Sequence, residues 1–140
     1  MVDVNHLAVK SLDGNWHYLV DQGGVVLYDA PGKVRDDGYA RSQHPLLVGA
    51  RGGYSSEYDF ADAPALKVPG DWNTQDPTLF RYEGVVLYQR DFTYQPKADK
   101  RMFLHIGAAN YRSHVWGNAK RICDHEGGFT PFDCEVTEAL

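Results

Sequence analysis

The sequence predicts an all-β protein, built as an antiparallel sandwich or jelly roll. Short runs rich in β-branched and aromatic residues recur along the chain, and turn residues separate them. The chain also lacks a convincing amphipathic stretch of helical length, so strands do not alternate with helices. Parallel strands need long crossover connections, which are usually helical. Short strands without such connections are therefore typical of antiparallel sandwiches and jelly rolls.

The predicted strands follow one another from the N-terminal part to the end of the chain. Trp16–Val20 is entered by the turn residues 13–15, and Val85–Tyr94 has the densest β-branched and aromatic content. In the segment 101–106, alternation places Met102, Leu104 and Ile106 on one face. The complete set of predicted strands is 16–20, 25–28, 65–68, 85–94, 101–106, 111–116, 121–125 and 133–136, with a hairpin between 111–116 and 121–125.

Composition and charge favour one globular domain over residues 1–140. The chain has 140 residues, of which 43% are hydrophobic and 24% charged, so it can bury a core. Its net charge is -5 and no Lys/Arg run occurs, which argues against nucleic acid and against an anionic membrane as partners. We expect no signal peptide within this chain, and the sequence leaves cytoplasmic and exported locations equally open.

Two long segments are predicted to be loops. Residues 29–62 are the least periodic part, with one short apolar patch at 46–48. Residues 71–84 form a polar and aromatic loop in which Trp72, Phe80 and Tyr82 alternate with polar residues (Asn73, Gln75, Arg81 and Glu83). Aromatic rings beside amides and charges suit a sugar. The composition favours the simpler interpretation that Trp72 and Tyr82 fix the loop to the sheet.

Residues with chemical potential form no recognisable catalytic or metal-binding pattern. The six histidines are scattered, no zinc spacing occurs, and the loop acids (Asp71, Asp76, Glu83 and Glu126) show no spacing that pairs them. We therefore expect no metal and no cofactor. Cys123 and Cys134 are predicted to be ordinary thiols, with a disulfide as the alternative, because sequence separation alone does not establish the geometry that a disulfide needs.

Five blocks in a fixed order support a more specific interpretation. They are SLDGNW at 11–16, VPGDWNTQ at 68–75, YEGVVLYQR at 82–90, HEGGFTPF at 125–132 and VT at 136–137. Together they resemble the N-terminal region of glycoside hydrolase family 2, which contains β-galactosidases, β-glucuronidases and β-mannosidases. The resemblance extends over nearly the whole chain.

The resemblance implies a sugar-binding-type jelly roll, similar to galactose-binding domains, at the front of a retaining exo-β-glycosidase. The catalytic glutamates of the family lie on a TIM barrel that has no counterpart here, so no residue of this chain is expected to be catalytic. The implied partners are a β-galactoside or β-glucuronide, the rest of the parent enzyme and, in some cases, a second copy. The residues expected at the rim of the sugar pocket are Trp72, Asn73, Arg81, Tyr82 and Glu83.

The sequence departs from the family pattern in two places. The usual Asn-Gly turn is Asn118-Ala119, which predicts a looser hairpin or a weaker constraint. The strand that follows the VT block in the family is missing, so we expect a fragment, or a sheet edge covered by something else. A free-standing carbohydrate-binding module and a fragment that docks on a separate barrel subunit remain the alternatives.

Overall fold

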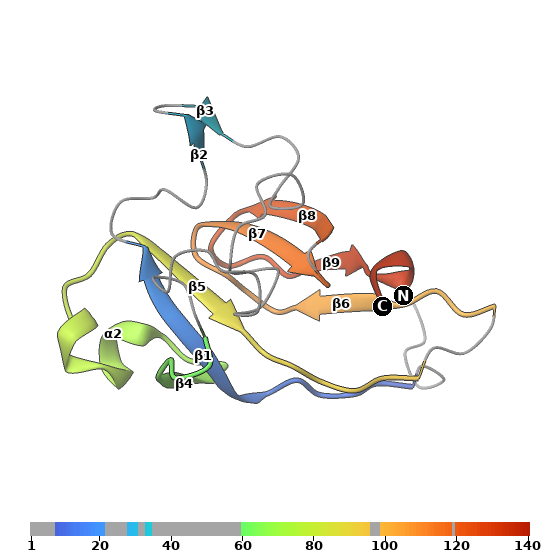
Figure 1. Ribbon diagram of the computed structural model, residues 1–140, viewed down its shortest axis with the longest axis horizontal. Coiled ribbons are helices and arrows are strands. Elements are labelled where there is room, and N and C mark those ends of the chain that lie inside the picture. Colours follow the sequence, from blue (N-terminus) through green and yellow to red (C-terminus); the bar gives the residue numbers. More distant parts are fainter. Residues whose placement is uncertain (1–7, 22–27, 31–32, 35–59, 96–98, 119) are drawn as a thin grey trace.

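The computed structural model describes residues 8–21, 28–30, 33–34, 60–95, 99–118 and 120–140 (Figure 1). The strands in these ranges are β1 (Gly14–Asp21), β2 (Tyr28–Ala30), β3 (Lys33–Val34), β4 (Ala65–Val68), β5 (Val85–Gln89), β6 (Phe103–Ile106), β7 (Arg112–Gly117), β8 (Lys120–Glu126) and β9 (Phe132–Glu135). Their pairings are antiparallel, which confirms the predicted all-β class with antiparallel strands. No described helix is long and apolar enough to cross a bilayer.

The first structural unit is a three-stranded sheet with the order β4-β1-β5. In β1, Tyr18 is opposite Tyr88 of β5, and Trp16 is opposite Leu66 of β4. Tyr18, Leu66 and Leu79 are buried in one cluster, because one face of the sheet packs against the segment that connects β4 to β5. This cluster is the hydrophobic core of the described structure, and partly buried residues pack around it (Val20, Trp72, Tyr82, Val86 and Tyr88).

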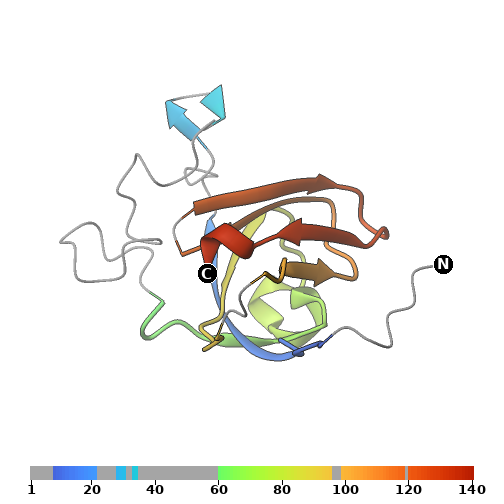
Figure 2. The ribbon, with the colours of Figure 1, turned by 90° about the vertical axis from the view of Figure 1, so that its right-hand side faces the viewer.

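The second unit consists of two strand pairs, β6–β9 and β7–β8. Figures 1 and 2 show these pairs next to each other, with β8 and β9 in contact. In β6, Leu104 and Ile106 are half-buried whereas Phe103 and His105 are exposed, and Met102, just before β6, is half-buried. The predicted alternation of Met102, Leu104 and Ile106 is therefore confirmed.

Most predicted strands are present, with shifted ends. The segment 65–68 matches β4, and the predicted hairpin is formed by β7 and β8. β5 ends at Gln89, so the predicted strand 85–94 was too long. Most of the predicted strand 25–28 and the apolar patch at 46–48 lie outside the described residues. The predicted long loop 29–62 contains β3 and all of β2 except Tyr28.

The hairpin turn between β7 and β8 uses a residue that tolerates a left-handed backbone. Asn118 has a φ of 46°, and asparagine adopts this conformation more readily than most residues. Its side-chain amide also donates a hydrogen bond of 2.7 Å to the carbonyl of Ala139. Asn118 thus accepts the positive φ that the turn requires and ties the turn to the last residues of the chain. Ala119 lies outside the described residues.

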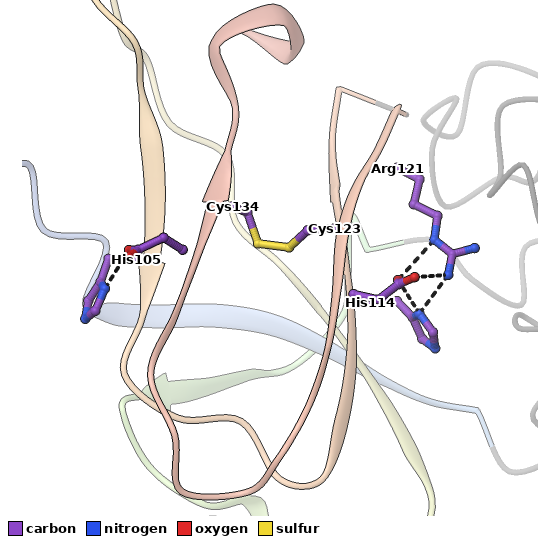
Figure 3. The surroundings of a disulfide bond; sticks show 7 residues. His105, His114, Arg121, Cys123 and Cys134 are labelled. Carbon is purple, nitrogen blue, oxygen red and sulfur yellow. Dashed lines mark hydrogen bonds and ion pairs between the residues drawn. A yellow bond between two sulfur atoms is a disulfide. The ribbon is translucent and has the colours of Figure 1, made fainter.

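The prediction of two ordinary thiols was wrong, because Cys123 and Cys134 form a disulfide (Figure 3). Cys123 lies in β8 and Cys134 in β9, with 5.8 Å between their Cα atoms. This separation is within the range that a disulfide spans. The prediction failed because the proximity depends on β8 and β9 lying side by side, which the sequence separation of 11 residues does not reveal.

Candidate functional site

The segment 71–84 is ordered by short helical turns, although a loop was predicted there. The helix α2 (Trp72–Gln75) begins after Asp71, whose carboxylate accepts hydrogen bonds from the backbone N–H (2.9 Å) and the hydroxyl (2.9 Å) of Thr74. These bonds lower the pKa of Asp71. An Asp at this position satisfies a free N–H group of the first turn. The helix escaped prediction because four residues are too few to show a helical periodicity in the sequence.

Asp76 ends α2 and begins the next turn, η6 (Pro77–Leu79). Its carboxylate accepts bonds from the backbone N–H (2.8 Å) and the hydroxyl (2.7 Å) of Thr78, and it also accepts the hydroxyl of Tyr18. The bonds from Tyr18 and Thr78 lower the pKa of Asp76. Burial and the bond to Asp76 raise the pKa of Tyr18 to about 12. Asp76 therefore connects the segment directly to β1.

Trp72 and Asn73 point into the segment and not away from it. Trp72 is half-buried against the core cluster, and its indole N–H donates to the carbonyl of Tyr82 at 3.3 Å. The side-chain amide of Asn73 donates to the carbonyls of Leu79 (2.7 Å) and Tyr82 (3.3 Å). Both side chains thus hold the two ends of the segment together, as the simpler interpretation of Trp72 expects.

Tyr82 closes the segment before β5. It is half-buried, and its hydroxyl donates to the carbonyl of Val85 at 3.1 Å. Burial, with a smaller contribution from the charge of Asp21, raises its pKa. Its ring also covers Gly84, since a Cβ at that position would lie 2.5 Å from the Tyr82 hydroxyl. Glycine is therefore required at this position if Tyr82 is to keep its place.

Of the predicted rim residues, Arg81 and Glu83 face solvent. Phe80, which is not in the predicted set, is also exposed, at 66%. The structure thus divides the predicted set into three residues that fix the segment (Trp72, Asn73 and Tyr82) and two whose side chains are free to contact a ligand or another polypeptide (Arg81 and Glu83). The described residues contain no group of three or more His, Cys, Asp or Glu that could hold a metal ion.

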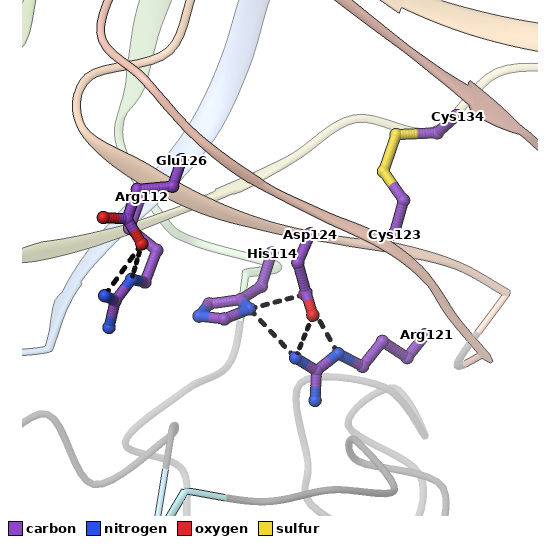
Figure 4. A network of polar contacts seen from close by, with 7 residues as sticks. All are labelled: Arg112, His114, Arg121, Cys123, Asp124, Glu126 and Cys134. Carbon is purple, nitrogen blue, oxygen red and sulfur yellow. Dashed lines mark hydrogen bonds and ion pairs between the residues drawn. A yellow bond between two sulfur atoms is a disulfide. The ribbon is translucent and has the colours of Figure 1, made fainter.

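A second polar cluster lies on the β7–β8 hairpin (Figure 4). The Asp124 carboxylate contacts Nδ1 of His114 at 2.6 Å and the guanidinium of Arg121 at 2.5 Å. Burial alone would raise the pKa of Asp124, but the bonds from Arg121 and His114 outweigh it and lower the pKa. The neighbouring cross-strand pair is Arg112–Glu126, at 2.9 Å.

Sequence reasoning missed this cluster because a β-bulge creates it. Val115 is opposite Cys123, but Trp116 is opposite Arg121, so Ile122 is the additional residue on β8. The bulge brings Arg121 to the same face as Asp124, although residues three apart in a regular strand face opposite sides. In regular register the predicted hairpin would place His114 opposite Cys123, so the pairing of His114 with Asp124 also depends on the bulge. The cluster forms internal ion pairs and has no arrangement suited to acid–base catalysis of glycoside cleavage.

Comparison with known proteins identifies β-glucuronidases as relatives of the chain. The chain is 30% identical to the β-glucuronidase of Canis lupus familiaris over 133 residues, which is 84% of this chain and 20% of that protein. It is 28% identical to the β-glucuronidase of Mus musculus, covering 94% of this chain and 18% of that protein. No family model matches the chain.

Solved structures agree with the sequence relatives. The β-glucuronidase of Lactobacillus rhamnosus superimposes with a TM-score of 0.65 and 27% identity, covering 94% of this chain and 18% of that one. The chain thus spans about a fifth of the length of these relatives. It is related to the β-glucuronidases over most of its own length, and the predicted resemblance to glycoside hydrolase family 2 is confirmed.

Proposed function

We propose that residues 1–140 form the N-terminal, non-catalytic jelly-roll domain of a retaining exo-β-glycosidase of the β-glucuronidase type. The parent enzyme hydrolyses terminal β-linked sugars in carbohydrate catabolism. The observation that carries this proposal is the pattern of coverage. The β-glucuronidases of Canis lupus familiaris, Mus musculus and Lactobacillus rhamnosus align with 84% to 94% of this chain, while the aligned part is only 18% to 20% of their own length.

In this proposal the chain has a structural role in the parent enzyme and forms part of the edge of the sugar pocket. The segment 71–84 is a suitable rim because two capping carboxylates and the core contacts of Trp72 hold its backbone in one conformation. A pocket edge that is already ordered loses little conformational entropy when a ligand binds. Arg81 and Glu83 are the residues that reach outward from it. Arg81 is a candidate partner for a sugar carboxylate, since a guanidinium pairs with a carboxylate through two hydrogen bonds.

A chimera tests the proposal. Residues 8–140 of this chain would replace the aligned segment of the solved L. rhamnosus β-glucuronidase, and hydrolysis of a chromogenic β-glucuronide would be measured. We expect the chimera to be active, while the same enzyme with the segment deleted and the 140-residue chain alone are inactive. A chimera that melts cooperatively but hydrolyses no glucuronide would contradict the proposal, as would hydrolysis by the 140-residue chain alone.

Arg81→Ala and Glu83→Ala in the active chimera would test the rim separately. Both side chains are exposed, so neither change should lower the melting temperature appreciably. A rise in KM with unchanged stability is expected if the side chains contact the substrate. An unchanged KM in both variants would remove the segment from the sugar pocket and leave the domain assignment intact.

The alternative of a free-standing carbohydrate-binding module receives less support from the structure. Such modules present an exposed aromatic ring to the face of a sugar. Trp72, the residue best suited by its type, is half-buried against the core and engages its N–H with Tyr82.

A further inference from the structure

The disulfide joins two parts of the second unit that are otherwise paired separately. β9 forms its backbone ladder with β6, and β8 forms its ladder with β7. Among the described strands no ladder joins β8 to β9, although the two are in contact. The Cys123–Cys134 bond is therefore a covalent cross-link between the two strand pairs, in addition to the two chain connections 107–111 and 127–131 (Figure 3).

The connection 127–131 is fixed at several points along its length. The N–H of Gly127 donates to the carbonyl of Tyr111 at 2.8 Å, and Nε2 of His125 lies 3.1 Å from the Thr130 hydroxyl. The His125 ring stacks on Phe132, with 4.1 Å between ring centroids. The disulfide closes this structure into a short loop that presents Phe129 with 93% of its surface exposed.

We propose that the Cys123–Cys134 disulfide is a redox-dependent lock, closed in an oxidising compartment, that holds the strand pairs β6–β9 and β7–β8 together. Closure transfers two electrons and two protons from the two thiols to a low-molecular-weight disulfide such as glutathione disulfide, which leaves as two thiols. Reduction by a thiol reverses these transfers through a mixed disulfide. The lock predicts an exported or otherwise oxidising setting for the mature chain, because such bonds persist there and are rare in the cytosol of most organisms.

Burial makes the closed lock resistant to thiols. Cys134 is only 1% exposed, so a reductant has no access to its sulfur in the folded chain. Attack at the half-buried Cys123 would release Cys134 as a thiolate in a buried position, where the charged form is disfavoured. We therefore expect reduction to require movement of β9 away from β8, and to be much slower in the folded chain than in the unfolded one.

The first test measures the state of the thiols in the full 140-residue chain after expression in an oxidising compartment. The chain would be alkylated with N-ethylmaleimide with and without prior reduction, and its intact mass determined. We expect no adduct without reduction and two adducts after reduction in denaturant. In folded conditions, millimolar reduced glutathione should leave the bond intact for much longer than in urea. Two adducts without any reduction, or equally fast reduction in both conditions, would overturn the proposal.

The second test asks whether the bond holds the structure. The melting temperature of the oxidised chain would be compared with that of the same chain reduced in denaturant and refolded with reductant present. Loss of the disulfide should lower the melting temperature of the chain by about 10 °C. The variant Cys123→Ala/Cys134→Ala is the control, since its melting temperature should not respond to the reductant. An equal melting temperature for the oxidised and reduced wild-type chains would overturn the lock even if the variant fails to fold.

Discussion

The two structural units of this chain are held together by different kinds of interaction. In the β4-β1-β5 sheet, apolar burial dominates, with Tyr18, Leu66 and Leu79 all below 7% exposure. In the β6–β9 and β7–β8 pairs, Cys134 is the one described residue that is fully buried, and the apolar side chains around it are half-buried or exposed. There the visible links are the disulfide and cross-strand ion pairs such as Arg112–Glu126.

This difference shows where the chain is sensitive to change. A truncated side chain in the first unit removes apolar contacts and leaves a cavity, which costs free energy in proportion to its size. Truncating one side chain of an exposed ion pair in the second unit leaves the other charge in water, so the free energy of unfolding changes little. The segment 71–84 connects two strands, but it is as sensitive to truncation as the first unit because Trp72, Leu79 and Tyr82 complete the core.

The largest effect is expected for Trp72→Ala. The change removes the ring that packs on the core cluster and the bond to the Tyr82 carbonyl, so the free energy of unfolding should fall by about 3 kcal/mol. Urea denaturation followed by circular dichroism measures it. Phe80→Ala is the matched control, since Phe80 is 66% exposed and its loss should change stability by less than about 0.5 kcal/mol. Equal losses of stability in the two variants would contradict the distinction between core and peripheral side chains of the segment.

Asn73→Ala should have the next largest effect. The variant loses the donor that bonds the carbonyls of Leu79 and Tyr82, so these part-buried acceptors are left without that bond. The expected loss is about 1–2 kcal/mol in the free energy of unfolding. Asn73→Asp should be at least as damaging, because a carboxylate cannot donate to a carbonyl. If Asn73→Asp were as stable as the wild type, the amide would not be what holds the segment.

The link between β1 and the segment should appear as a pH dependence. The pKa of Tyr18 is raised to about 12, against 10.0 for an ordinary tyrosine, so the folded chain keeps this proton when the unfolded chain releases it. The stabilisation is complete below pH 10 and is lost as the pH rises toward 12. An ultraviolet titration of the wild type minus that of Tyr18→Phe should have its midpoint near 12. A difference curve with a midpoint at the ordinary value of 10 would mean that Tyr18 is neither buried nor bonded to Asp76.

The sequence was sufficient for the all-β class, for the β7–β8 hairpin and for the half-buried face of β6. Alternation of apolar residues is a local property, and it identified that face of β6. The motif blocks supplied what periodicity could not, namely the relationship to β-glucuronidases. Short helical turns escaped prediction because α2 and η6 are too short to repeat a pattern, even though Asp71 and Asp76 are typical capping residues.

The remaining features depend on contacts between distant strands. The disulfide requires β8 beside β9, and the His114–Asp124–Arg121 cluster requires a bulge at one position of β8. Neither leaves a local mark in the sequence. For the segment 71–84, composition identified the mixture of aromatic and polar residues but not the orientation of their side chains. Whether Trp72 faces the core or solvent depends on the packing of the segment against the sheet.

The smallest effect is expected for Arg112→Ala in the second unit. The Arg112 and Glu126 side chains are 61% and 51% exposed, so water already screens their attraction. A double-mutant cycle with Glu126→Ala should give a coupling of less than about 1 kcal/mol. That coupling should shrink further as salt is added. A larger, salt-independent coupling would mean that ion pairs stabilise this unit as strongly as apolar burial stabilises the first. The disulfide would then be one of several strong links between its strand pairs, and reduction would lower the melting temperature by less than the lock requires.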